Sequence, residues 1–170
     1  GVVYEDSAFG SGGNVEIGDA AAKFGLPIGA RVKIAVGDKP EAMKKQVEKL
    51  QQAGVDGIAI YMASVAKQEL ADFLKVARAA GKFTIVGSPL LAGNHVIELA
   101  KDSSEGSHAV VDAVFGTEPV SKSFQDKYIA QFKSEPEVSQ TFAYDALHLL
   151  AKAERSRSQS KLLLSAASHK

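Results

Sequence analysis

The stretch VEKLQQAGVDGIAIY, residues 47–61, decides the fold, because a helical segment leads through a glycine into a short apolar strand. The same unit occurs twice more, where helical segments lead through Gly25 to residues 31–36 and through Gly81 to residues 83–86. Glycine is favoured just past a helix because it adopts the left-handed conformation without a Cβ penalty. Strands that are nearly all apolar are typical of a parallel sheet covered by helices on both faces.

The helices between these strands carry one apolar face each. Met43, Val47 and Leu50 recur at helical spacing, and so do the apolar residues of the next helix, Leu70, Phe73, Leu74 and Ala77. Asp38 followed by Pro40 and Glu41 predicts a helix start, with Asp38 as the cap and Glu41 closing a capping box. The sequence therefore predicts an α/β fold: a doubly wound, mainly parallel sheet with helices on both faces.

The regular alternation of helical segments and apolar strands changes after about Asn94. Residues 95–100 are expected to form a short helix and residues 109–115 another strand, followed by a turn-rich break at 116–119. Two amphipathic helices come next, and no strand follows to cover their apolar faces. Residues 154–160 are expected to form a polar linker before a final helix near residue 162. We therefore predict an α/β ligand-binding lobe over residues 1–116 and helices of a second, incomplete lobe over residues 117–170.

Composition excludes several classes of protein. Of the 170 residues, 45% are apolar and 24% are charged, as in a soluble globular protein. The 20 basic residues balance the 20 acidic ones, which argues against a nucleic-acid partner. No segment approaches the roughly 18 consecutive apolar residues of a membrane span, so no direct membrane insertion is expected. The absence of cysteine excludes disulfides, a thiol nucleophile and zinc sites with cysteine ligands.

Motifs for catalysis or cofactor binding are incomplete. The glycines at positions 10, 12 and 13 follow a strand, where a phosphate cradle would lie, but Val15 occupies the third glycine position of the dinucleotide fingerprint. We interpret this cluster as a flexible strand-to-helix turn. The four histidines lack metal-ligand spacing, and Ser11 lacks the first glycine of a nucleophile elbow. The sequence predicts no enzyme activity, no cofactor and no metal.

A ligand site is predicted from position instead. In an open parallel sheet, ligands bind beyond the carboxyl ends of the strands. The segments there contain aromatic surface, hydroxyls and free amides at helix N-termini, a mixture that orients a small polar molecule without reacting with it. Strand-end packing for Tyr61 and a helix cap for Ser64 are the structural alternatives. The candidate ligand-binding residues are Ser7, Phe9, Tyr61, Met62, Ser64 and Ser88.

Four stretches resemble the branched-chain amino-acid-binding (Leu/Ile/Val-binding) family of ABC-transporter receptors, which have the type I periplasmic binding fold. The most specific is Phe124 to Phe132 with Glu135-Pro136 and then Phe142-Ala143-Tyr144-Asp145-Ala146-Leu147, which resembles the paired helices of the family's C-terminal lobe. The others are residues 3–10, 49–58 and 99–106, and all four run in order along the chain.

This resemblance implies a periplasmic or otherwise extracytoplasmic, membrane-tethered protein. It implies that two lobes close over a small solute and deliver it to a membrane permease, and that a whole N-terminal lobe is missing from this chain. Phe9 corresponds to an aromatic position of the family. Amino-acid binders place a carboxylate after the fourth strand, whereas residues 87–91 contain no acid, so a neutral, acidic or aromatic solute is favoured unless Glu5 or Asp6 substitutes.

Two alternatives stay open at this point. One is a cytoplasmic ligand-sensing regulatory domain of the same fold, which a DNA-binding or dimerising segment upstream would indicate. The other is a doubly wound phosphate- or nucleotide-binding enzyme, which a phosphate bound at residues 10–13 would indicate.

Overall fold

The computed structural model describes residues 1–63, 66–111 and 118–167, and for Val138 and residues 158–167 it describes the backbone alone. The chain divides into one unit from Gly1 to Val111 and another from Asp112 to Lys170. The boundary expected between residues 116 and 117 lies outside the described residues. The division into 1–116 and 117–170 therefore stays a prediction.

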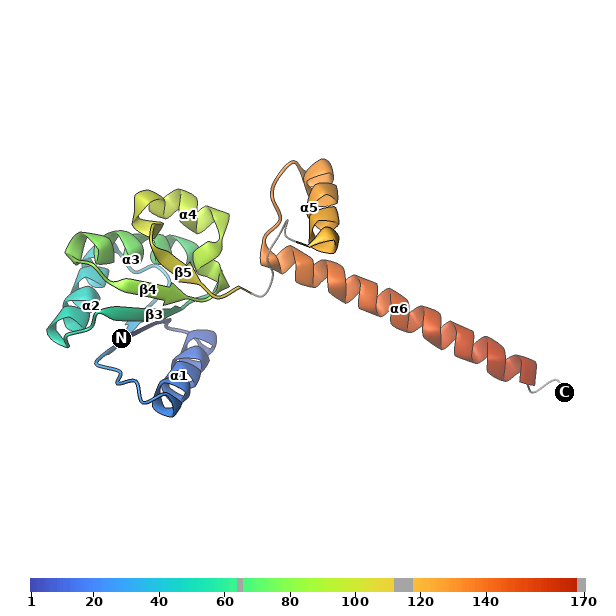
Figure 1. Cartoon of the computed structure of the whole chain (residues 1–170), viewed down its shortest axis with the longest axis horizontal. Coiled ribbons are helices and arrows are strands. Elements are labelled where there is room, and N and C mark those ends of the chain that lie inside the picture. The colour runs from blue at the N-terminus through green and yellow to red at the C-terminus, as the bar shows by residue number, and fades with distance from the viewer. Residues whose placement is uncertain (64–65, 112–117, 168–170) are drawn as a thin grey trace. The chain divides into compact units, whose positions relative to one another are not determined.

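The first unit is built on a five-stranded sheet in the order β2-β1-β3-β4-β5, and every neighbouring pair is parallel (Figure 1). This confirms the predicted α/β fold with a parallel sheet. The strands are β1 (Val2–Glu5), β2 (Arg31–Ile34), β3 (Gly57–Tyr61), β4 (Thr84–Gly87) and β5 (Ser107–Ala109).

The helices that connect the strands lie on both faces of the sheet. The chain steps from β1 to β2 at one edge and then passes back over β1 to β3, so that right-handed crossovers place the first helix opposite the later ones. In Figure 1, α1 lies on one side of the strands, and α2, α3 and α4 lie on the other. Their bounds are α1 (Ala8–Lys23), α2 (Pro40–Gln52), α3 (Lys67–Ala80) and α4 (Asn94–Ala100), with short 3₁₀ turns η2 (Pro89–Ala92) and η3 (Lys101–Ser104).

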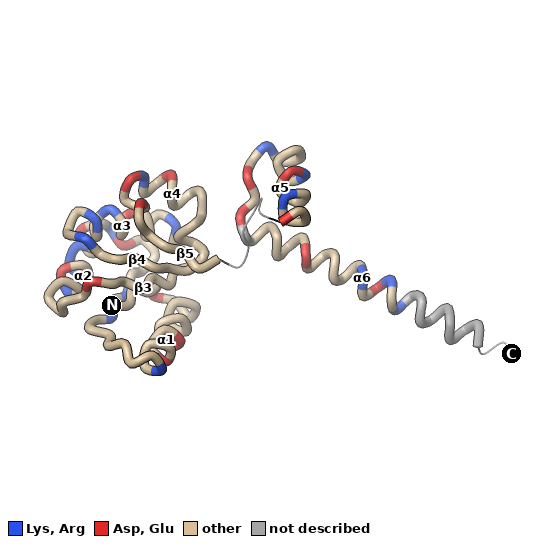
Figure 2. Tube along the Cα trace, viewed as in Figure 1, with Lys and Arg blue, Asp and Glu red and all other residues tan. Residues whose placement is uncertain are grey.

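The hydrophobic core fills the space between the sheet and α2 to α4. Both predicted helix stripes are buried there, and the inward residues of the strands pack against them. The largest core side chains have no more than about two per cent of their surface exposed and include Phe73, Ile34, Met43, Leu50, Ile60, Met62, Leu70, Leu74 and Ile85. Figure 2 shows basic and acidic residues interspersed on these helices, without a stripe of one sign.

The opposite face of the sheet is covered less completely than the sequence predicts. Helix α1 contacts β1 and β3, and burial alternates along β2 and β4, where Arg31, Lys33, Thr84 and Val86 are exposed. Two of the strands are therefore half-buried, although the apolar runs indicated burial on both faces.

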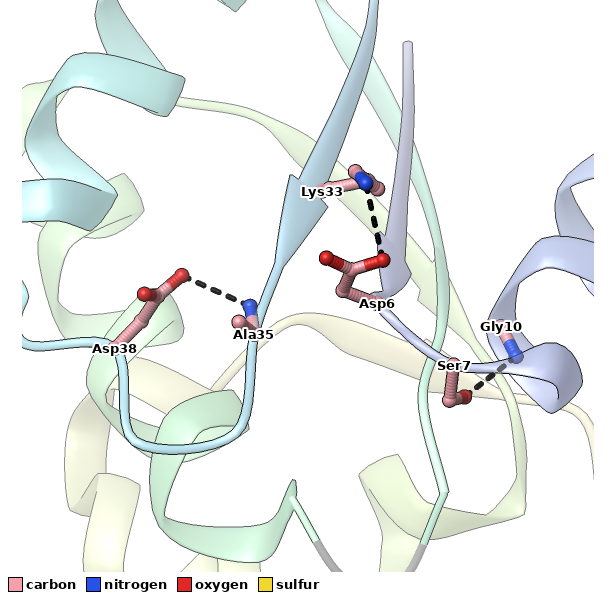
Figure 3. Close-up of polar contacts among 6 residues, drawn as sticks. All are labelled: Asp6, Ser7, Gly10, Lys33, Ala35 and Asp38. Atoms are coloured by element: carbon pink, nitrogen blue, oxygen red, sulfur yellow. Dashed lines mark hydrogen bonds and ion pairs between the residues drawn. The ribbon is translucent and has the colours of Figure 1, made fainter.

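Helix α2 starts differently from the prediction. Lys39 is its N-cap, and Pro40 is in its first turn as expected. The Asp38 carboxylate does not cap the helix; it accepts a hydrogen bond from the amide of Ala35 at 2.8 Å (Figure 3). Asp38 therefore closes the turn after β2, because a short acidic side chain reaches nearby backbone amides as readily as the first helical turn.

The fifth strand was predicted too late in the chain. Strand β5 ends at Ala109, Val110 and Val111 lie outside any strand, and residues 112–115 lie outside the described residues. Ala109 pairs with Gly87, the last residue of β4. The amide of Val110 still donates to the carbonyl of Gly87 at 2.9 Å, and the ladder ends there because β4 turns into η2 beyond Gly87.

The second unit contains two helices, α5 (Pro119–Phe132) and α6 (Val138–Ala167). Phe124 on α5 packs against Tyr144 on α6 with ring centroids 5.0 Å apart, and Leu147, Leu149 and Leu150 of α6 are exposed. The polar linker expected at residues 154–160 is wrong, because α6 continues through it. Its Glu, Arg and Gln residues are good helix formers, and polarity alone does not end a helix.

Candidate ligand-binding edge of the sheet

The candidate site lies where β1 and β3 end. These strands are neighbours, with Tyr4 in register with Tyr61, yet the chain visits β2 between them. The connection from β1 leaves over one face of the sheet and the connection from β3 over the other. Ligands of open α/β sheets bind at such a switch point, outside the carboxyl ends of the strands. We therefore expect ligand-binding groups in the segments that follow Glu5 and Tyr61.

Two predicted residues meet at this edge. The ring of Phe9, in the first turn of α1, stacks on the ring of Tyr61, with centroids 4.7 Å apart and an angle of 25° between the planes. Phe9 remains 49% exposed, whereas Tyr61 is half-buried beneath it. The pair thus presents an aromatic surface to solvent from a rigid strand end and the start of a helix.

Ser7 caps the helix that carries Phe9. It is the N-cap of α1, and its hydroxyl oxygen accepts a hydrogen bond from the amide of Gly10 at 3.1 Å (Figure 3). An N-cap side chain satisfies one of the amides that have no partner within the helix. Ser7 therefore sets the direction of the first turn, which carries Phe9.

The glycine cluster is not the flexible turn that the sequence suggested, because Gly10, Gly12 and Gly13 lie inside α1. A Cβ on Gly10 would lie 2.0 Å from the backbone oxygen of Glu5, and one on Gly13 would lie 2.0 Å from the Tyr61 ring. Close approach of α1 to the sheet explains both positions. A loop wrapped around a phosphate is therefore not formed by this segment.

Met62 and Ser88 face the interior at the same edge. Only 1% of Met62 is exposed, and its side chain belongs to the core. Ser88 is 7% exposed, and its hydroxyl donates to the Met62 carbonyl at 3.0 Å. Ser64 lies outside the described residues, and the N-cap of α3 is Ala66. Of the six predicted residues, Phe9 and Tyr61 form the surface, and Ser7 and Ser88 have partners within the protein.

The two carboxylates after β1 have different environments. Glu5 is 2% exposed, and its Oε2 accepts a hydrogen bond from the amide of Ala63 at 2.8 Å. Asp6 is exposed and pairs with Lys33 at 3.0 Å (Figure 3). The hydrogen bond and charge attraction of Asp6 hold the pKa of Lys33 above its ordinary value. The carboxylate of Asp6 is therefore accessible to solvent, whereas that of Glu5 is not.

Two buried glutamates hold loops near this edge; the sequence pointed to Glu5 only as a possible partner of a solute ammonium group, and it gave no role to Glu69. Besides Glu5, Glu69 on α3 is 8% exposed and its Oε1 accepts from the amide of Gly37, in the turn after β2, at 2.7 Å. Each holds a loop that follows a different strand. The available signal was the position of Glu5 as the last residue of an apolar strand, where a charged side chain needs a specific partner when buried.

Within the described ranges, no three His, Cys, Asp or Glu side chains gather to hold a metal ion. Over the same residues, none of the helices combines the length and apolar character required to cross a bilayer.

The sequence model of a family described as "Periplasmic binding protein" matches residues 1–160. Among curated proteins, none matches the chain in sequence.

Solved structures share the fold. The leucine binding protein LivK of Thermotoga maritima superposes with a TM-score of 0.76 at 22% identity, over 91% of this chain and 44% of that one. The branched-chain amino acid transporter substrate binding protein LivJ of Streptococcus pneumoniae, in complex with isoleucine, gives a TM-score of 0.71 at 22% identity, over 89% and 43%. A periplasmic binding protein type 1 of Bordetella pertussis gives 0.68 at 23% identity, over 77% and 35%. The chain thus spans less than half the length of these proteins.

Proposed function

The chain belongs to the periplasmic binding protein family, and on this premise we propose that it is part of the extracytoplasmic solute-binding component of an ABC transporter. It captures a small polar molecule between two lobes and catalyses no reaction. Its partners are the solute and the membrane permease that receives it. The protein acts in the periplasm, or outside the membrane in a tethered form.

The observation that carries this proposal is the stacked pair of Phe9 and Tyr61 at the switch point between β1 and β3. Nearly half of the Phe9 surface is exposed, although Phe9 lies in the first turn of a helix that Ser7 caps. An aromatic side chain at a ligand-binding surface contributes large contact area with little loss of conformational entropy. We assign this pair to the solute-facing surface of the lobe.

The charged groups at this edge already have partners within the protein, so the aromatic surface is the stronger guide to the class of solute. The carboxylate of Glu5 is buried and bonded to Ala63, and Asp6 is already paired with Lys33. A solute ammonium group would therefore compete with Lys33 for Asp6. A solute carboxylate would compete with Asp6 for Lys33 in the same way, whereas the ring of an aromatic acid also gains from stacking on Phe9. We therefore place aromatic acids ahead of aliphatic amino acids among the candidate solutes.

Capture requires closure of a second lobe onto this edge. The solute stabilises the closed state by contacts that exist only there, and the permease reads the closed state. Because this chain presents one side of the site, we expect weak binding by the 170-residue chain alone.

Saturation-transfer NMR with a panel of benzoate, 4-hydroxybenzoate, L-leucine and L-isoleucine tests this function. We expect transfer to at least one member of the panel, its loss in Phe9→Ala, and its retention in Phe24→Ala. Phe24 is 80% exposed at the other end of α1, so it controls for nonspecific contact with an exposed phenyl ring. Equal transfer in both variants, or none in the wild-type chain, contradicts the proposal.

A further inference from the structure

One peptide group, the one that joins Met62 to Ala63, is held at both of its polar ends by buried side chains. Its N–H donates to Glu5 Oε2 at 2.8 Å, and its carbonyl oxygen accepts from Ser88 Oγ at 3.0 Å. We propose that Glu5 and Ser88 are positioning residues that fix this peptide and thereby present Tyr61 and Phe9 as a rigid solute-facing surface.

The two side chains come from opposite sides of β3. Glu5 is the last residue of β1 and Ser88 immediately follows β4, and these strands flank β3 in the sheet. Ser88 also donates its backbone amide to the carbonyl of Ile60 at 3.0 Å. The segment that follows β3 is therefore hydrogen-bonded to residues from both neighbouring strands, just beyond the end of the regular ladder.

Burial makes these contacts specific. Glu5 is 2% exposed and Ser88 is 7% exposed, so water cannot readily replace either partner. A hydrogen bond from an amide to an ionised carboxylate is roughly twice as strong as one between neutral groups. A buried polar atom that loses its partner is also costly, which favours a single arrangement of the peptide.

Glu5 also organises the segment that carries Phe9. The backbone oxygen of Glu5 accepts a hydrogen bond from the amide of Ser7 at 2.8 Å. The same oxygen occupies the space that a Cβ on Gly10 would need. Backbone and side chain of one residue thus connect the start of α1 with the end of β3. The two rings of the stacked pair belong to these two segments, so their mutual position depends on Glu5.

The role of the positioned surface rests on the proposed function, but the positioning is measured without any solute. We would compare Glu5→Ala, Glu5→Gln and Ser88→Ala with Asp6→Asn, which alters the adjacent exposed carboxylate. The readouts are amide hydrogen exchange at Ala63 and the nuclear Overhauser contacts between the rings of Phe9 and Tyr61.

We expect exchange at Ala63 to accelerate about tenfold or more in Glu5→Ala, in line with the loss of one hydrogen bond to a charged group. Ring contacts should weaken in the same variant. Glu5→Gln should restore both, because its amide oxygen accepts the same bond, and Asp6→Asn should change neither. Ser88→Ala should accelerate exchange at Ala63 by a smaller factor.

Two outcomes would overturn the proposal. One is wild-type exchange and ring contacts in Glu5→Ala, even with a lowered melting temperature, since that indicates a merely structural residue. The other, decisive if Glu5→Ala does not fold, is an unchanged Ala63 amide in Ser88→Ala. Failure of the solute panel with intact positioning would instead contradict the proposed function alone.

Discussion

Gly13 of α1 lies directly against the ring of Tyr61 of β3, so that a Cβ on Gly13 would stand 2.0 Å from Tyr61 Cδ1. This contact brings the helix close enough to the sheet for Phe9 to stack on the same ring. The absence of a side chain at one position is thus a condition for the aromatic surface at another.

Gly13→Ala should destabilise the protein by about 1–3 kcal/mol, because the added methyl group forces either the helix or the Tyr61 ring to move. The matched control is Gly12→Ala, since nothing lies within 4 Å of a Cβ there. That change should stabilise the protein by up to about 1 kcal/mol, as alanine is the better helix former. Urea unfolding measures both, and equal effects would contradict the close contact.

Glu69→Ala should lower the free energy of unfolding by about 1–3 kcal/mol, because the amide of Gly37 loses the buried carboxylate that accepts its hydrogen bond. Glu48→Ala removes an exposed glutamate from α2 and should change the free energy of unfolding by no more than about 0.5 kcal/mol. Chemical denaturation compares the two variants. Amide exchange at Gly37 should accelerate only in Glu69→Ala, and acceleration in both variants would count against this hydrogen bond.

Lys101→Gly should stabilise the protein. Lys101 has a φ of 52° with a ψ of −133°, a backbone conformation that side chains disfavour. Relief of this strain should raise the free energy of unfolding by about 1–3 kcal/mol. The greater conformational freedom of glycine in the unfolded chain lowers that gain by up to about 1 kcal/mol. Lys82→Gly changes an exposed residue whose φ is not positive, so this control should not stabilise the protein. Melting temperatures that fall in both variants would refute the strain at Lys101.

Asp6→Asn should lower the pKa of Lys33 toward its ordinary value of 10.5, because Asp6 raises it first through a hydrogen bond and then through charge attraction. The folded-state pKa is raised, so the pair contributes stability below about pH 10.5 and loses it as the pH rises through the folded value. A ¹³C titration of the lysine Cε resonance measures the shift. Asp72→Asn, which removes the pair with Lys75, should leave Lys33 unchanged.

The elements of the first unit were largely predictable because their signals are local. Met43, Val47 and Leu50 repeat at helical spacing, and all three are buried where α2 meets the sheet. The helix at residues 94–100 was also predicted to within one residue. The predicted start of the last strand was two residues late, since β5 runs from Ser107 to Ala109, and residues 112–115 of that prediction lie outside the described part of the chain.

The candidate site was predictable in place but not in detail. Parallel strands end at one edge, so segments far apart in the sequence had to meet there. The sequence did not distinguish Phe9, which is exposed on the stacked pair, from Met62 and Ser88, which face inward. That difference depends on how each strand end turns, and the turn depends on partners such as Glu5 and Ala63, which are 58 residues apart.

The sequence by itself determined the alternation of helices and strands and the sheet edge at which the segments after the strands meet, because periodicity and parallel connection act over short stretches of chain. Only the tertiary structure decided the order of the strands, the burial of Glu5, and the contact that makes Gly10 and Gly13 necessary. These follow from close packing between distant segments, and packing selects among side-chain partners that local sequence leaves equally open.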